Sequence, residues 1–241
     1  MAKRNKEVKM NDHYIMDSIG TILRSATSAF AMKAEKLTAA ASWSPELPFE
    51  HHHKIENIRV MEQTVGAVMT AVATSEGMIN EVLSGAANRS ALRSRTIGNV
   101  PENVYTRWGR LWDQGAFKRG SNALEKCQLA LSIADLPPLE KGSRSVESMA
   151  ALILLRNSLV HSEPRFRRHG ADVPQKDRDS LERRLTGKFT DNELVRKEAP
   201  YIWQRCLGAG CARWSVATMF AFQNEFFEAL GIEIQADVRW G

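Results

Sequence analysis

Cysteine, long apolar runs and strand-like alternation are all scarce in this sequence. Its three cysteines, Cys127, Cys206 and Cys211, form no C-x-x-C pair and have no His-x-x-x-His nearby, so neither a zinc site nor a disulfide framework is expected. We expect reduced, buried thiols in a cytoplasmic protein. No stretch approaches the roughly 18 uncharged apolar residues of a membrane-spanning helix, and residues 1–30 lack the apolar segment of a signal peptide. No membrane association is expected.

The composition is that of an ordinary globular protein. Of 241 residues, 43% are hydrophobic and 25% are charged, which excludes disordered and collagen-like chains. The net charge of +5 permits a nucleic-acid partner without requiring one. Basic residues are concentrated in two segments. Residues 89–119 contain seven basic and two acidic residues, and residues 165–188 contain eight basic and four acidic residues.

Hydrophobic spacings of three and four residues recur through most of the chain and predict an all-α fold. They predict long helices over 8–37 and 50–83, separated by a Ser/Pro-rich break at 42–48, and later helices over 123–134, 146–163 and 211–230. Residues 85–120 form a basic, loop-rich insertion with one or two short helices. We therefore expect an N-terminal helical extension, 1–45, and one helical domain, 46–241.

Helix boundaries follow from capping residues and prolines. Ser121 or Asn122 is expected to begin the helix at 123, and Ser145 the helix at 146. That helix should end at Glu163, because the residue before Pro164 is disfavoured in helical geometry. Thr190 and Glu193 have the spacing of a capping box.

The helix predicted over 146–163 is apolar on nearly all its faces, so both of its sides should be buried, one of them against a second element or a second subunit. Three polar residues interrupt this surface. Asn157 and His161 are neighbours at i and i+4, and Arg156 precedes them. A buried arginine needs a carboxylate, a phosphate or water, and a histidine in the last turn can exchange a proton near neutral pH.

The run Arg156-Asn157-Ser-Leu-Val-His161 resembles the R-N-x-x-x-H motif of the HEPN superfamily of all-α domains, many of which are endoribonucleases. That family places the motif near the end of a late helix of a bundle, as predicted here. The segment Val72–Glu81, with Glu76 and Ile-Asn-Glu, is similar to an early family helix. Weaker similarities occur at Ala123–Cys127 and Cys211–Trp214, so that the resemblance spans about 50–230.

The resemblance implies a homodimer in which two motifs share one cleft and cut RNA without a metal or cofactor. His161 would be the general base or acid, Arg156 would hold the scissile phosphate, and Asn157 would orient His161 or a phosphate oxygen. The 2′-hydroxyl of the ribose would be the nucleophile, leaving a 2′,3′-cyclic phosphate. The family also implies a toxin or defence role, with an antitoxin or another regulatory partner. Directly after the motif, basic residues are candidates for binding RNA: Arg165, Arg167 and Arg168.

Other interpretations of the motif stay open. Arg156 could be a core residue paired with a glutamate, His161 a satisfied helix-end histidine, and Asn157 a partner of backbone groups. The domain could also bind RNA or a nucleotide, or serve as an interaction module, without catalysis. Glu76 lies on the apolar stripe of its helix and is expected to support the site by pairing with Arg156 or another basic group near the cleft, the alternative being a solvated carboxylate.

Two further groups invite functional interpretations. His51, His52 and His53 are consecutive, so on a helix they point in different directions and are a solvated helix start rather than a metal site. Trp108 and Trp112 could stack on RNA bases, although a hydrophobic contact with the bundle is the favoured interpretation.

Overall fold

The computed structural model describes residues 19–41, 49–88, 100–117, 122–161, 180–197, 199 and 201–231. Every regular element within these segments is helical, which confirms the predicted all-α class. In chain order they are α1 (Ile19–Ala40), α2 (Phe49–Asn88), α3 (Glu102–Asp113), α4 (Ala123–Ile133), α5 (Arg144–Val160), α6 (Ser180–Leu185), the π-helical turn η2 (Tyr201–Arg205) and α7 (Ala209–Ala229).

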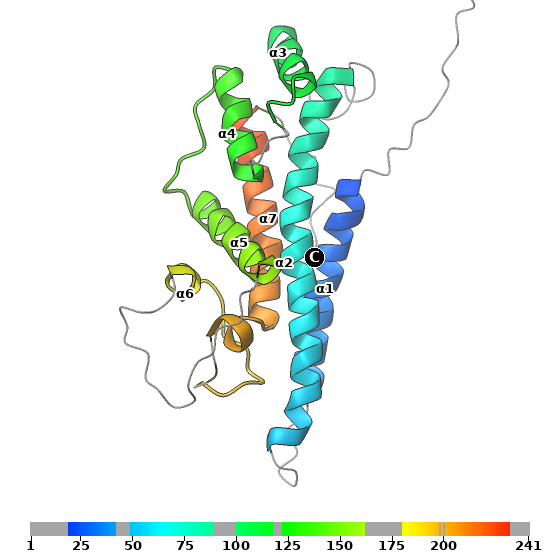
Figure 1. Cartoon of the computed structure of the whole chain (residues 1–241), viewed down its shortest axis with the longest axis vertical. Coiled ribbons are helices and arrows are strands. Elements are labelled where there is room, and N and C mark those ends of the chain that lie inside the picture. Colours follow the sequence, from blue (N-terminus) through cyan, green and yellow to red (C-terminus); the bar gives the residue numbers. More distant parts are fainter. Residues whose placement is uncertain are drawn as a thin grey trace, which may run out of the picture.

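Helix α2 is the longest described helix, and most of the other helices pack against it. Its 40 residues extend for about 60 Å, at 1.5 Å per residue, and it contacts α1, α3, α4, α5 and α7 (Figure 1). The apolar stripe predicted from the sequence is buried in its later part, where Val72, Ile79 and Leu83 are fully enclosed. At the start of the helix the prediction is wrong, because Ile55 and Ile58 are 60% and 47% exposed. The helix predicted over 50–83 is thus confirmed, with an extra turn at its C-terminal end.

Helix α1 runs antiparallel to α2 and also contacts α7 (Figure 1). Small residues permit this close packing, and Ala34, Ala67 and Ala212 form a fully buried seam. Gly66 contributes as well, because a Cβ there would lie 2.9 Å from the ring of Phe30. The part of the predicted helix before residue 19, and the break at 42–48, lie outside the described residues.

Helix α3, within the predicted insertion, packs against α2 and α4. Trp108 is fully enclosed, and its indole Nε1 donates to the backbone oxygen of Ala130 over 3.0 Å. The hydrophobic interpretation is therefore confirmed for Trp108, which has no exposed ring face on which a base could stack. Trp112, one turn later, is half-buried.

The boundaries of two helices test the predicted caps. Asn122 begins α4, and its side chain and that of Glu125 form a reciprocal capping box. The prediction that Ser145 begins α5 is wrong. Ser143 is the cap, because its Oγ accepts from the backbone N–H of Val146 over 3.3 Å, whereas the Ser145 hydroxyl bonds the carboxylate of Glu225.

The predicted C-terminal limit of α5 is also wrong. The helix ends at Val160, three residues before the expected Glu163, and His161 follows it with φ −107° and ψ 44°. Pro164 disfavours helical geometry only at residue 163, so it does not determine the earlier end.

The capping box predicted at Thr190 and Glu193 is wrong too, because residues 190–197 contain turns and no helix. Asn192 accounts for the difference. Its backbone N–H donates to the oxygen of Arg205 over 2.7 Å, and its Nδ2 donates to the oxygen of Leu207 over 3.2 Å. These bonds attach the segment to the chain just before α7, in place of a helical turn.

Replacing Gly210 by alanine is expected to lower the free energy of unfolding by about 1–3 kcal/mol through overpacking. A Cβ at this position would lie 2.5 Å from the backbone oxygen of Thr190, so the 190–192 segment would have to move. Urea unfolding of the two proteins measures the difference. Gly142→Ala is the control, because a Cβ at Gly142 would meet nothing within 4 Å, and equal losses for both variants would contradict the packing argument.

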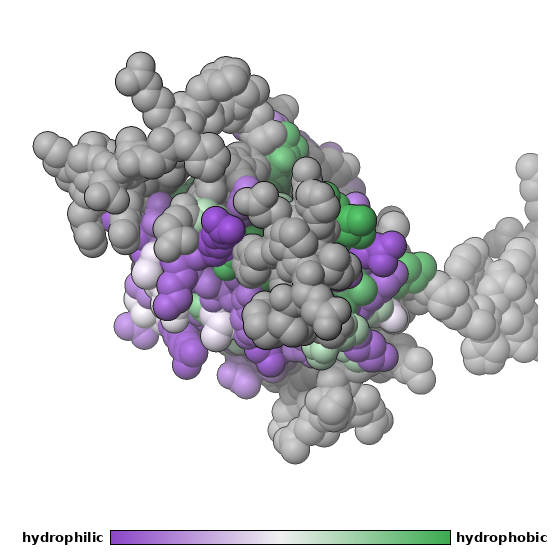
Figure 2. Space-filling model, turned by 90° about the horizontal axis from the view of Figure 1, so that it is seen from below, coloured by the Kyte–Doolittle hydropathy of each residue, from purple (hydrophilic) through white to green (hydrophobic). Residues whose placement is uncertain are grey.

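Among the helices that the structure describes, none is both long enough and apolar enough to cross a lipid bilayer. Seen from the end where α2 begins, most of the described surface is hydrophilic, and the hydrophobic residues form separate patches (Figure 2).

Candidate functional site

The R-N-x-x-x-H residues lie over the last turn of α5 and its C-cap. Buried Met149, Leu152 and Leu155 hold this helix against the core, and it contacts α2, α4, α6 and α7. At the C-terminal end of α5, the backbone N–H of His161 donates to the oxygen of Asn157 over 2.9 Å, which holds the backbone of His161 against the last turn. The helix therefore presents the three motif residues at the point where it passes α2.

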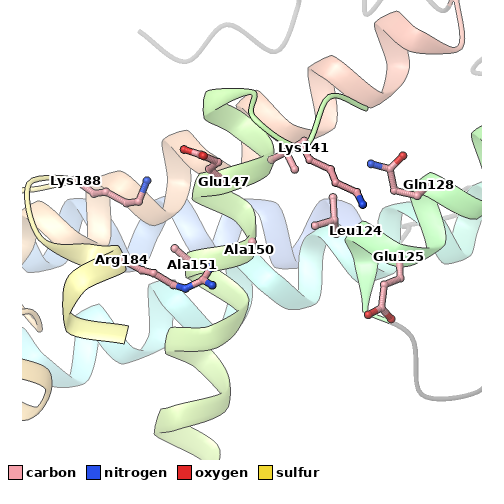
Figure 3. A pocket seen from close by; sticks show the side chains of 10 residues that line it. Leu124, Glu125, Gln128, Lys141, Glu147, Ala150, Ala151, Arg184 and Lys188 are labelled. Atoms are coloured by element: carbon pink, nitrogen blue, oxygen red, sulfur yellow. The ribbon is translucent and has the colours of Figure 1, made fainter. Parts of the chain in front are cut away.

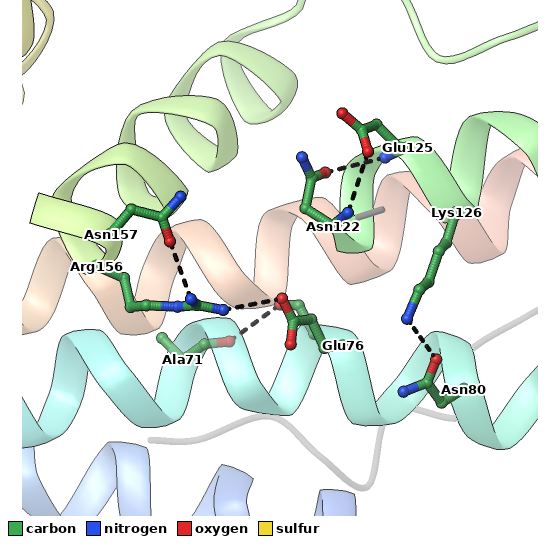
Figure 4. Close-up of polar contacts among 9 residues, drawn as sticks. Ala71, Glu76, Asn80, Asn122, Glu125, Lys126, Arg156 and Asn157 are labelled. Carbon is green, nitrogen blue, oxygen red and sulfur yellow. Dashed lines mark hydrogen bonds and ion pairs between the residues drawn. The ribbon is translucent and has the colours of Figure 1, made fainter. Parts of the chain in front are cut away.

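Arg156 is paired with Glu76, as the sequence predicted. Its Nη2 lies 3.1 Å from Oε1 of Glu76, and its Nη1 donates to Oδ1 of Asn157 over 2.9 Å (Figure 4). The side chains of Arg156 and Glu76 are 27% and 31% exposed, so the pair is half-buried and open to solvent on one side. The alternative of a merely solvated Glu76 is thus wrong, and the guanidinium has a defined orientation.

A second polar contact extends the site along α2. One helical turn after Glu76, Oδ1 of Asn80 accepts from Nζ of Lys126 on α4 over 2.9 Å (Figure 4). Lys126 is only 9% exposed, which is unusual for a lysine. Sequence reasoning assigned no role to either residue. The i, i+4 spacing of Glu76 and Asn80 was the available signal, because it places both on one face of α2.

His161 lies on a different side of α5 from Arg156. Five residues at 100° each separate it from Arg156 by about 140° around the helix axis, and its side chain is exposed. No hydrogen bond or ion pair joins its imidazole to another residue in the described part of the chain. One chain therefore brings together Arg156, Asn157 and Glu76, whereas the imidazole of His161, on the Asn157 side of the helix, is bonded to none of them.

Within the described part of one chain, α5 is not buried on both sides, and burial of its second side by another subunit stays a prediction. Its inner side is closed, but on the outer side Leu154 and Val160 are 40% and 49% exposed. These two residues flank Asn157 and His161 on the same side of the helix. The open side of α5 thus combines exposed apolar surface with the motif histidine.

All three cysteines are free and buried, as predicted. Burial raises the pKa of the Cys211 thiol to about 12, although a hydrogen bond with Ser215 lowers it in part. Burial likewise raises the pKa of Cys127 and of Cys206. The three thiols are therefore protonated at neutral pH and are poor nucleophiles and ligands.

Several candidate residues are not placed by the structure. The three arginines proposed to bind RNA, Arg165, Arg167 and Arg168, lie outside the described residues, and so do the side chains of His51, His52 and His53. Within the described part of the chain, no three His, Cys, Asp or Glu side chains are grouped so that they could hold a metal ion.

Comparison of the chain with known proteins finds no match among protein-family models, curated proteins or solved structures. The resemblance to the HEPN superfamily therefore depends on the residues quoted above and on their positions in the helices.

Proposed function

We propose that this chain is a metal-independent endoribonuclease of HEPN type, acting as a homodimer. The observation that carries the proposal is the end of α5, where Arg156 is held by Glu76 and Asn157 while His161 is exposed one turn later. An arginine has five N–H donors, and two of them are used in these contacts. The others remain for a phosphate group.

The open side of α5 supports the dimer. Leu154 and Val160 would be covered by a second copy, and the site would then contain two histidines and two arginines. Such a dimer would bring Arg156 and His161 together although they are separated within one chain, because His161 of one copy would lie opposite Arg156 of the other.

The chemistry requires one proton to be removed and one to be supplied. The imidazole of His161 would take the proton of the ribose 2′-hydroxyl, whose oxygen forms a bond to phosphorus as the bond to the 5′-oxygen breaks. The histidine of the second copy would protonate the leaving oxygen. Arg156 would bind the non-bridging oxygens, whose charge grows in the transition state. By family resemblance, such an activity would serve as a toxin or a defence effector under a regulatory partner.

The purified protein is expected to cleave single-stranded RNA in excess EDTA and to leave 2′,3′-cyclic phosphate ends. An oligonucleotide with 2′-deoxyribose at every position should remain intact, because it lacks the internal nucleophile. Gel electrophoresis and mass spectrometry of the fragments measure both results. RNA that stays intact, or deoxy substrates that are cut equally well, would contradict the proposal.

A second candidate function is RNA binding without catalysis. The Arg156–Glu76 pair supports it, because the carboxylate holds the guanidinium in place for a phosphate but offsets part of the charge that would stabilise a transition state. This module would bind RNA with strong dependence on salt and would form no product. Binding measured at two salt concentrations, together with the cleavage assay, separates the two functions.

A further inference from the structure

A cavity of about 660 Å³ lies apart from the motif, between α4, the first turns of α5 and the chain around α6 (Figure 3). Its volume is within the range of pockets that hold small molecules. Leu124, Val146, Ala150 and Ala151 give it an apolar lining along α4 and α5. Nothing described above uses this cavity.

Three cations surround this apolar lining. Arg184 and Lys188 reach toward α5 from the α6 side, and Lys141 lies on the opposite side (Figure 3). No ion pair or hydrogen bond joins these three side chains to another residue in the described segments. They are therefore available to an anion, with nothing in the described chain to be displaced.

The other polar groups of the lining are mostly engaged within the protein. The amide of Gln128 makes hydrogen bonds of 2.9 and 3.0 Å to the backbone of Leu139, and Glu125 accepts from the backbone N–H of Asn122. Glu147 is the exception. It lies in the first turn of α5, where the helix dipole stabilises a carboxylate, and it could accept from an amino or hydroxyl group of a ligand.

We propose that this cavity binds a nucleotide. The phosphate would contact Arg184 and Lys188, the planar base would lie on the apolar lining, and Glu147 would accept a hydrogen bond from a base or ribose donor. The choice of a nucleotide over other anions rests on the proposed ribonuclease function. It also has a geometric basis, because Ala150 of the cavity and His161 lie on the same face of α5.

That shared face relates the cavity to the candidate site. Eleven residues separate Ala150 from His161, so they differ by about 20° around the helix and about 16 Å along it. Exposed Leu154 lies between them on this face. In the proposed dimer the second copy covers Leu154, so an RNA strand that reaches both the cavity and the histidine would pass along the edge of that interface, while a free nucleotide would occupy the cavity alone.

Isothermal titration with adenosine 5′-monophosphate tests the proposal. The unmodified protein is expected to bind it with a Kd below about 1 mM, and Arg184→Glu to weaken binding at least about tenfold, as expected for losing a charge-assisted hydrogen bond. Arg183→Glu is the matched control, because Arg183 is its exposed neighbour on α6 but does not line the cavity. Absence of binding at millimolar ligand, or equal weakening by both variants, would overturn the proposal.

A competition experiment identifies the source of the nucleotide. If adenosine 5′-monophosphate displaces an oligoadenylate RNA from the protein, and Arg184→Glu weakens both, the cavity holds a unit of the strand. Binding without displacement indicates a site for a free nucleotide, and either result supports a nucleotide cavity. Nucleotide binding without RNA cleavage would contradict the proposed ribonuclease but support the nucleotide-binding cavity. RNA cleavage without nucleotide binding would support the ribonuclease and contradict the nucleotide-binding cavity.

Discussion

Replacing His161 by alanine is expected to lower the rate of RNA cleavage by about 10²–10⁴-fold, the usual contribution of a general acid or base. The free energy of unfolding should change by less than about 0.5 kcal/mol, because the exposed imidazole makes no hydrogen bond or ion pair with the described residues. The backbone bond that ends α5 is retained in the variant. Initial rates in EDTA and urea unfolding measure the two quantities.

Ser158→Ala is the matched control, since Ser158 lies inside the motif but, among the described residues, its hydroxyl bonds only the oxygen of Leu155 in its own helix, over 2.8 Å. It should cleave RNA at the rate of the unmodified protein. Full activity of the His161 variant would remove the histidine from the mechanism, and with it the proposed enzyme.

Arg156→Ala separates catalysis from a purely structural role. If the polar cluster only stabilised the core, this change would leave Glu76 uncompensated and cost several kcal/mol. The observed exposures of 27% and 31% favour a smaller cost, about 1 kcal/mol, because water screens the pair and solvates the remaining carboxylate. Under the enzyme proposal the same variant loses cleavage while it stays folded.

The sequence was sufficient to predict the parts of the site that lie on regular helices. Glu76 falls on the apolar stripe of α2, where a carboxylate requires a partner, and Arg156 is the partner that the structure supplies. The contact between Asn80 and Lys126 could not be predicted in this way, because lysine is ordinarily a surface residue and α4 can pack against α2 in several registers.

Helix ends and turns were less predictable, because they depend on contacts between distant parts of the chain. Ser143 and Ser145 are both good capping residues, and the carboxylate of Glu225 on α7 engages both hydroxyls. Thr190 and Glu193 have suitable spacing for a cap, but Asn192 bonds the backbone at Arg205 and Leu207 instead. In both cases the polar partner lies further along the chain, where spacing within the local sequence does not reveal it.

Replacing Trp108 by alanine is expected to lower the free energy of unfolding by about 3–5 kcal/mol, measured by urea unfolding. The ring of Trp108 on α3 is fully enclosed. Its loss also removes the hydrogen bond from the indole Nε1 to the backbone oxygen of Ala130. Trp108→Phe keeps most of the apolar contact and should cost about 1–2 kcal/mol, while Trp112→Ala, at a half-buried position of the same helix, should cost less than Trp108→Ala. A Trp108 variant that keeps its stability but loses RNA binding would show that the ring contacts nucleic acid. Because the indole is buried, we expect instead that RNA binding by the Trp108 variants decreases only in proportion to the fraction of protein that is unfolded.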